Sequence, residues 1–132
     1  MKYIMITGAS SGIGEETARL LARQEDVTTI LVARNEEKLK KLVNEFGGET
    51  KYLVYDLTDI EHIESCFIKC REWGIKLDGL IHCAGIGENM PIRLIQTEHI
   101  KKMYQIHPMA FIELGKYFSK RKYSNDGSSI VV

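Results

Sequence analysis

Apolar and polar positions follow two patterns in turn along the chain. Short runs that are apolar at nearly every position predict strands, and longer stretches with apolar residues three and four apart predict helices. The predicted strands are 3–6, 28–33, 51–55, 79–83 and 129–132, and the helical patterns cover roughly 12–24, 36–46, 59–73 and 97–121. Because each strand run but the last is followed by a helix, we expect a three-layer, doubly wound α/β fold around one parallel sheet.

The periodicity also predicts which helix faces are apolar and where helices end. Gly47-Gly48 would stop the second helix, Thr58-Asp59 would cap the third, and Gly74 would end it. The basic stretch 116–123 is expected to be the solvated end of the longest helix, since cations are favoured there. The residues expected on one face are Ile13, Thr17, Leu20 and Leu21 in the first helix and Leu39, Leu42, Val43 and Phe46 in the second.

Composition places the chain among ordinary globular domains. The 132 residues are 44% hydrophobic and 27% charged, with a formal net charge of zero, which predicts a single domain over 1–132. Neutral charge gives no reason to expect binding to nucleic acid or to an anionic membrane. The apolar runs are far shorter than the ~20 residues of a membrane span. Glycines follow the first strand so early that no signal peptide fits before them, and we expect a cytoplasmic protein.

Three cysteines and four histidines raise the question of a metal or redox site. Cys66 and Cys70 share a helix face, but their spacing is not the two-residue gap of redox motifs, and four zinc ligands are not grouped. We expect reduced thiols in a packed face and predict no metal site. The other residues of these types are Cys83, His62, His82, His99 and His107, and the histidines show no ligand spacing.

A glycine-rich segment, 7-TGASSGIG-14, joins the first strand to the first helix. Gly8 can take backbone angles that are closed to residues with a Cβ, Gly12 lets an anion approach the backbone, and Gly14 lets the helix press against the sheet. The N–H groups of the first helical turn and the positive end of the helix dipole can bind phosphate oxygens. A purely structural tight turn is the alternative, and the missing lysine after Gly14 disfavours nucleotide triphosphate hydrolysis.

This segment resembles the cofactor motif of the short-chain dehydrogenase/reductase family, and two later segments support the resemblance. The stretch 56-DLTD-59 follows the third strand, and 82-HCAG-85 follows the fourth and is similar to the family's Asn-Asn-Ala-Gly. The resemblance implies strand order 3-2-1-4-5, with Asp56 near the adenine amino group and the second segment beside a ribose. The implied cofactor-binding residues are Gly8, Ser10, Ser11, Gly12, Ile13, Gly14, Arg34, Asp56, Leu57, Cys83, Ala84 and Gly85.

The end of the second strand predicts NADP(H) in preference to NAD(H). An NAD site places a carboxylate there for the ribose hydroxyls, whereas this chain has Ala33 followed by Arg34. The guanidinium can bind a 2′-phosphate through charge-assisted hydrogen bonds, and Ser11 could add a hydroxyl. Alternatively, Arg34 is a solvated residue at the start of a helix.

The catalytic residues that the resemblance implies are absent from the 132 residues. The family uses a Ser beyond its fifth strand and a Tyr-x3-Lys pair, and no Tyr-x3-Lys occurs in this sequence. His107, which is followed by Pro108, occupies the position of an Asn that helps relay protons in the family, and it could have either this role or a packing role. His82 is expected to be structural. We therefore expect the cofactor-binding part of an alcohol/ketone oxidoreductase, without the C-terminal strands of the fold, or a non-catalytic dinucleotide-binding module or truncated product. The family implies a small carbonyl or alcohol substrate and a homo-oligomer.

Overall fold

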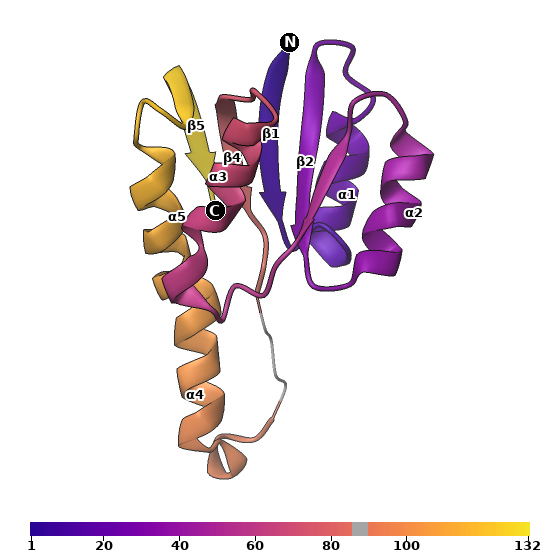
Figure 1. The fold of residues 1–132 in the computed structure, drawn as a ribbon. Coiled ribbons are helices and arrows are strands. Elements are labelled where there is room, and N and C mark those ends of the chain that lie inside the picture. The colour runs from indigo at the N-terminus through magenta and orange to yellow at the C-terminus, as the bar shows by residue number, and fades with distance from the viewer. Residues whose placement is uncertain (86–89) are drawn as a thin grey trace.

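The computed structural model describes residues 1–85 and 90–132 and contains one parallel five-stranded sheet (Figure 1). The strand order is β3-β2-β1-β4-β5, as predicted. Chain connectivity therefore reverses direction between β1 and β4, which is where α/β sheets bind ligands. The strands are β1 (Lys2–Thr7), β2 (Val27–Ala33), β3 (Lys51–Val54), β4 (Leu77–His82) and β5 (Ser124–Val131).

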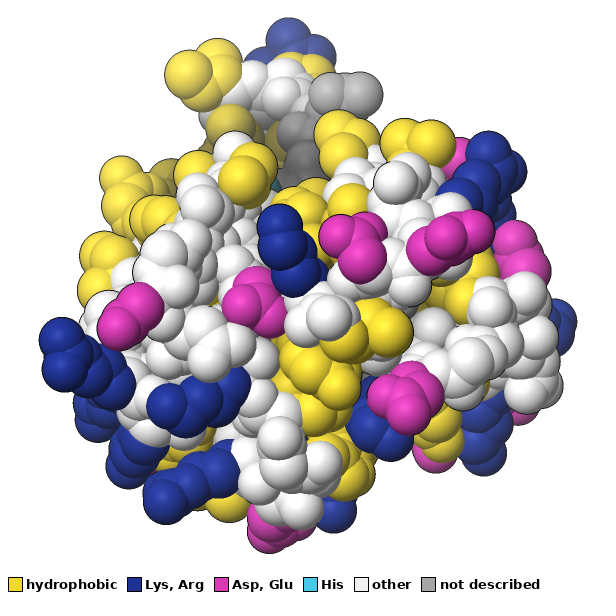
Figure 2. Space-filling model, turned by 90° about the horizontal axis from the view of Figure 1, so that it is seen from above, with side chains coloured by type: hydrophobic (Ala, Val, Ile, Leu, Met, Phe, Trp, Pro, Cys, Tyr) yellow, Lys and Arg dark blue, Asp and Glu magenta, His cyan; other side chains and the backbone are white. Residues whose placement is uncertain are grey.

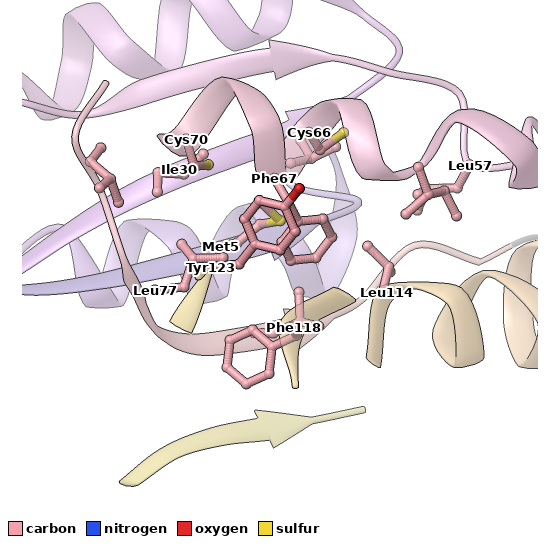
Figure 3. Close-up of a cluster of buried hydrophobic side chains, with 14 of the residues drawn as sticks. Met5, Ile30, Leu57, Cys66, Phe67, Cys70, Leu77, Leu114, Phe118 and Tyr123 are labelled. Atoms are coloured by element: carbon pink, nitrogen blue, oxygen red, sulfur yellow. The ribbon is translucent and has the colours of Figure 1, made fainter. Parts of the chain in front are cut away.

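Helices cover both faces of the sheet, so that two cores form. One core lies under the helices α1 (Gly12–Leu21) and α2 (Glu36–Phe46), and the other lies under α3 (Glu64–Glu72) and α5 (Ala110–Phe118). Figure 3 shows the second core around Phe67, which is fully buried. Cys66 and Cys70 are free thiols that pack in this core, which confirms the prediction for them.

The first helix packs on the sheet through smaller residues than we predicted. Its buried residues are Gly14 and Ala18, whereas Ile13 and Leu20 are 79% and 61% exposed. The predicted apolar face is therefore wrong at these two positions, because the small residues let the helix backbone approach the strands closely. The predicted face of α2 is correct: its leucines are buried, and Val43 and Phe46 are half-buried against the same core.

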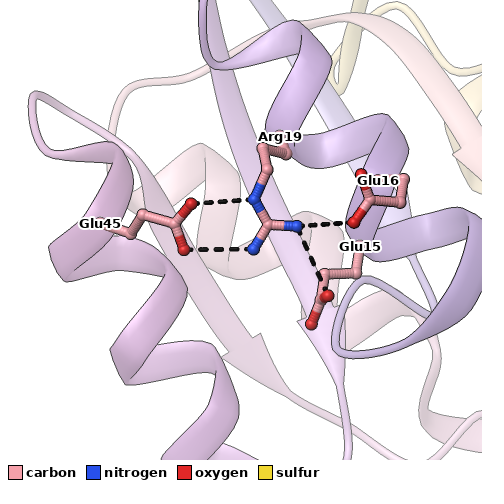
Figure 4. Close-up of polar contacts among 4 residues, drawn as sticks. All are labelled: Glu15, Glu16, Arg19 and Glu45. Atoms are coloured by element: carbon pink, nitrogen blue, oxygen red, sulfur yellow. Dashed lines mark hydrogen bonds and ion pairs between the residues drawn. The ribbon is translucent and has the colours of Figure 1, made fainter.

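Arg19 joins α1 to α2 on their outer side. Its guanidinium lies 2.8 Å from Glu45 of α2, 2.8 Å from Glu16 and 3.4 Å from Glu15 (Figure 4). The contact with Glu45 is two-pronged, since Nε and Nη2 donate to its two oxygens. Exposed pairs of this kind contribute little to stability individually, but a fork-like pair fixes the relative position of the two helices.

Two predicted helices are interrupted. The third consists of a 3-10 turn, η1 (Ile60–His62), and α3, and Asp59 places no side-chain cap on the turn. The fourth consists of α4 (Thr97–Tyr104), a π turn η3 (Gln105–Met109) and α5, preceded by a second 3-10 turn, η2 (Ile92–Leu94). Pro108 lies within the π turn, because proline cannot donate the backbone hydrogen bond that a regular helix requires. The glycine stops at Gly47 and Gly74 are as predicted, each with a positive φ.

The last strand begins earlier than the apolar run alone predicts. β5 starts at Ser124, and its pairing with β4 shifts between Leu77 and Gly79, which pair with Ser124 and Ser129. The Asn125 side chain contributes to this edge by donating to Asp78 Oδ1 over 3.0 Å. The edge strand exposes apolar side chains, and Val131 is 56% exposed.

Figure 2 views the end of the molecule where the strands begin, which is opposite to the site described below. Acidic and basic side chains are interspersed there, and Lys and Arg gather on the flank of α5 and β5. Lys116, Lys120, Arg121 and Lys122 are exposed at and beyond the end of α5, so these basic side chains form a solvated helix end, as predicted. Lys116 pairs with Glu113 and Lys122 with Glu64. In the described part of the chain, no helix has both the length and the apolar character that crossing a bilayer requires.

Candidate functional site

A cleft of about 290 Å³ opens at the carboxyl ends of β1, β2 and β4, with the segment after β3 at one side. The sequence predicted twelve residues for this site, and eleven of them line the cleft. Gly14 is the exception, because it is buried in the first turn of α1. The lining residues are Gly8, Ser10, Ser11, Gly12, Ile13, Val32, Ala33, Arg34, Tyr55, Asp56, Leu57, Cys83, Ala84, Gly85 and Ile106.

The turn between β1 and α1 has the conformation that its glycines allow. Gly8 and Gly12 have φ values of 67° and 56°, in the left-handed region that favours glycine. A Cβ on Gly14 would lie 2.1 Å from the Gly8 carbonyl oxygen, so the helix could not begin here with a larger residue. A Cβ on Gly12 would meet no atom within 4 Å, Ser11 places no side-chain cap on the first N–H groups of α1, and Gly12 and Ile13 line the cleft. This space and the helix dipole suit an anion.

A positive and a negative side chain line the cleft beyond this turn, after the adjacent strands β2 and β3, and are near enough to interact electrostatically. Arg34 is exposed in the two-residue connection to α2, and Asn35 caps that helix by accepting from the Lys38 amide. Asp56 accepts hydrogen bonds from the amide and the hydroxyl of Thr58, at 3.0 and 2.8 Å. Burial opposes ionisation of Asp56, but these bonds and the charge of Arg34 outweigh it, and the pKa of Asp56 lies below its ordinary value. The carboxylate is therefore an oriented acceptor.

The turn after β4 packs directly on the glycine turn. The Cys83 amide donates to the Thr7 carbonyl over 3.2 Å, and a Cβ on Gly8 would lie 2.6 Å from the Ala84 nitrogen. The buried ring of His82 bonds to Thr7 and to the Ile106 carbonyl, which confirms the structural role predicted for it.

His107 covers the other side of this turn. A Cβ on Gly85 would lie 2.3 Å from Cε1 of His107, so glycine is required for the ring to pack there. Packing is thus one role of His107, and the relay role stays a prediction.

An apolar groove of about 730 Å³ continues from the cleft and shares Ile13, Cys83 and Ala84 with it. This apolar groove runs between α1, the ends of β4 and β5, and the π turn. Its remaining lining residues are Thr17, Ile81, His82, His107, Pro108, Phe111, Val131 and Val132.

The sequence analysis missed three lining residues that do not belong to a motif. Val32 and Tyr55 come from the ends of the second and third apolar runs, and their position at a carboxyl strand end was the available signal. Ile106 had no such signal, because the π turn brings it to the cleft from a distant helix. Within the described ranges 1–85 and 90–132, no three His, Cys, Asp or Glu side chains gather as a metal site.

Comparisons with known proteins agree with this geometry. The sequence profile of the "short chain dehydrogenase" family matches residues 2–132. An uncharacterized oxidoreductase of Listeria innocua is 34% identical over 110 residues, which cover 80% of this chain and 44% of the relative. A benzil reductase of Saccharomyces cerevisiae, named as (S)-benzoin forming, is 35% identical over 109 residues, which cover 79% of this chain and 41% of the relative.

A solved structure is similar over most of the chain. The L-sorbose reductase of Gluconobacter frateurii, complexed with NADPH and L-sorbose, superimposes with a TM-score of 0.78 at 29% identity, over 89% of this chain and 46% of the reductase. The chain thus spans less than half the length of these relatives. The profile match, the strand order and the cleft show that this chain belongs to the short-chain dehydrogenase/reductase family of oxidoreductases, whose members bind a nicotinamide dinucleotide.

Proposed function

We propose that this chain is the NADP(H)-binding portion of a short-chain dehydrogenase/reductase. The observation that carries the proposal is the cleft itself, where the glycine turn, an arginine and an oriented carboxylate converge at the point where strand order reverses. The open N–H groups of α1 would bind the pyrophosphate, and Asp56 with Leu57 would receive the adenine. The Cys83–Gly85 turn would lie beside the nicotinamide ribose. Ser10 and Ser11 would supply hydroxyl donors from the glycine turn.

Arg34 would select NADP(H) over NAD(H). Ala33 at the end of β2 is only 8% exposed and carries no charge, so nothing at this position repels a phosphate. Hydrogen bonds to a charged group contribute about 1.5–3 kcal/mol. Arg34→Glu removes them and adds repulsion, so NADPH should bind ~10–150-fold more weakly, while NADH binding changes little.

A fluorescence titration with both reduced cofactors tests this choice. Arg121→Glu is the matched control, because it makes the same charge change beyond the end of α5, at the opposite end of the sheet, and should leave both affinities unchanged. Equal losses for NADPH and NADH in Arg34→Glu would refute the assignment to the 2′-phosphate. Absence of any saturable signal at millimolar cofactor with the folded wild type would refute nucleotide binding altogether.

In the complete enzyme, the reaction would be oxidoreduction of an alcohol/ketone pair. A nicotinamide dinucleotide held by the glycine turn, Arg34 and Asp56 would supply the hydride for the carbonyl carbon, and a separate proton donor would supply the proton for its oxygen. The apolar groove would receive the nicotinamide and part of a small carbonyl substrate. The benzil and L-sorbose reductases to which the chain is similar are named for carbonyl compounds of this general kind.

These 132 residues contain no Tyr-x3-Lys pair for the proton transfer, so we expect binding without turnover from this chain alone. This expectation keeps a non-catalytic nucleotide-binding module as the second candidate. Ketone-dependent NADPH oxidation by the isolated chain would contradict the expectation. We further propose a cytoplasmic protein that self-associates, and sedimentation velocity over a range of concentrations tests the association.

A further inference from the structure

The buried His82 ring lies between the sheet and the π turn, and both of its nitrogens have partners. It is 5% exposed. Nδ1 lies 2.7 Å from Thr7 Oγ1, and Nε2 lies 3.0 Å from the carbonyl oxygen of Ile106. The Phe111 ring stacks on it with centroids 6.0 Å apart. The imidazole is therefore held on two edges and one face.

The chemistry of these partners determines where the hydrogen atoms lie. A carbonyl oxygen only accepts, so Nε2 of His82 must carry a hydrogen and donate it to Ile106. The Ala84 amide donates to Thr7 Oγ1 over 3.3 Å, and the threonine hydroxyl can in turn donate to Nδ1. The neutral Nε2–H tautomer thus satisfies every group in the chain from Ala84 to Ile106. A second proton on Nδ1 would leave the buried Thr7 hydroxyl without its acceptor.

This chain of hydrogen bonds connects two walls of the cleft. Ala84 belongs to the turn after β4, Ile106 belongs to the π turn, and both line the cleft. The next residue, His107, packs on Gly85, so the two walls are also in direct contact. Rotation or release of the His82 ring would change the spacing between them.

We propose that His82, as the neutral Nε2–H imidazole, is a positioning residue that fixes the Cys83–Gly85 turn against the π turn, so that protonation of its ring weakens nucleotide binding. The effect on affinity rests on the proposed function. The tautomer and the coupling between the walls do not, because they are properties of the free protein.

The electrostatic surroundings agree with this geometry. Burial lowers the pKa of His82, and this effect, together with the charge of His107 on the π turn, outweighs the hydrogen bonds to the backbone at Ile106 and His107, which favour the protonated ring. Cys83, which follows His82 in the chain and lines the same apolar groove, is also titratable, and burial raises the pKa of that thiol. In the unfolded chain the ring takes up its proton near pH ~6.5. The native state resists this proton, so its stability is full above that pH and falls as the pH falls through it.

Long-range ¹H–¹⁵N spectra of the histidine rings in the wild type give the first test. We expect His82 as the Nε2–H tautomer at pH 7.5, still neutral where the exposed His62 has already taken up its proton. Hydrogen bonding to Asp59 raises the pKa of His62, which makes it an internal reference. An Nδ1–H tautomer, or a His82 ring that titrates at or above pH ~6.5, would overturn the proposal.

The threonine gives the second test without altering the histidine. Thr7→Val keeps the side-chain shape and removes the hydroxyl, whereas Thr7→Ser restores it. Thr7→Val should speed amide hydrogen exchange both at Ala84 and in the π turn and weaken NADPH binding ~3–10-fold, and Thr7→Ser should reverse most of both effects. Faster exchange at Ala84 alone would show that the two walls are not coupled and would refute the proposal.

The third test compares NADPH affinity at pH 7.5 and at the lower pH at which the spectra of the first test show the His82 ring protonated, in the wild type, His82→Asn and the surface control His62→Gln. The 2′-phosphate of NADPH, a phosphate monoester, itself titrates near pH ~6. The test is therefore the difference between the variants in how much affinity each loses on acidification. Wild type and His62→Gln should lose more affinity on acidification than His82→Asn. Equal losses in all three would refute the proposal and leave nucleotide binding intact, whereas no NADPH binding at any pH would refute the proposed function. If His82→Asn does not fold, the first two tests decide.

Discussion

Replacing Gly8 with alanine should destabilise the fold in two ways, through the backbone conformation of this residue and through steric contact with the turn after β4. The residue has a φ of 67°, and an added Cβ would lie 2.6 Å from the Ala84 nitrogen, 2.7 Å from its Cα and 2.8 Å from the Cys83 carbonyl carbon. These are backbone atoms of a packed turn, and they cannot move aside as a flexible side chain would. Gly48 has a similar φ of 61° and nothing within 4 Å of its ideal Cβ. Gly48→Ala is therefore a control that has the conformational cost alone.

The expected magnitudes follow from this comparison. The left-handed conformation costs an alanine roughly 1–2 kcal/mol, and forcing an extra carbon into packed structure costs about 1–3 kcal/mol. Gly48→Ala should lower the free energy of unfolding by ~1–2 kcal/mol and Gly8→Ala by ~2–5 kcal/mol. Urea titration followed by far-UV circular dichroism and by the fluorescence of the single tryptophan, Trp73, measures both. NADPH affinity should fall in Gly8→Ala only.

Equal destabilisation by the two variants would refute the steric part of this reasoning. It would mean that the turn after β4 can move away from Gly8 at no cost. Unfolding of Gly8→Ala without urea, with a cooperative transition retained in Gly48→Ala, would support the reasoning as an extreme case.

Two further predictions concern the core and the thiols. Phe67→Ala should lower the free energy of unfolding by about 3–5 kcal/mol, because the ring is fully buried. Ile68 is 45% exposed on the same helix, so Ile68→Ala should lower it much less. Similar urea midpoints for the two variants would contradict the packing described. Burial raises the pKa of Cys66 and Cys70 to about 12, whereas Cys83 is partly exposed in the cleft. An alkylating reagent at pH 8 should therefore label Cys83 first, and NADPH should slow the labelling of Cys83; mass spectrometry measures both. Early labelling of Cys66 and Cys70 would contradict a stably packed core under α3.

The sequence alone determined the fold class and most of the cleft. Apolar runs and helical periodicity are local patterns, so they located five strands and the helical segments between them, although two of the predicted helices are interrupted and β5 begins five residues earlier than predicted. The resemblance of three segments to a known family then implied that Gly8, Arg34, Asp56 and Cys83 belong to one site, which agrees with the carboxyl ends of parallel strands sharing one edge of the sheet. Cofactor choice remains a prediction from Ala33 and Arg34.

Only the tertiary structure decided features that depend on contacts between distant segments. Periodicity placed Ile13 and Leu20 on the same face as Leu21, but the helix packs through Gly14 and Ala18, because small residues give the closest approach to the sheet. The register shift in β5 likewise depends on its pairing with β4 and could not be predicted from its own residues.

The hydrogen-bonded chain through His82 is the clearest case of this kind. Its hydrogen-bonded pairs are 24 to 77 positions apart in the sequence, and its hydrogen positions follow from a carbonyl that a π turn brings to the ring. A sequence pattern records which side chains can donate or accept. Which of them meet depends on how strands and helices pack, and that is a property of the folded chain alone.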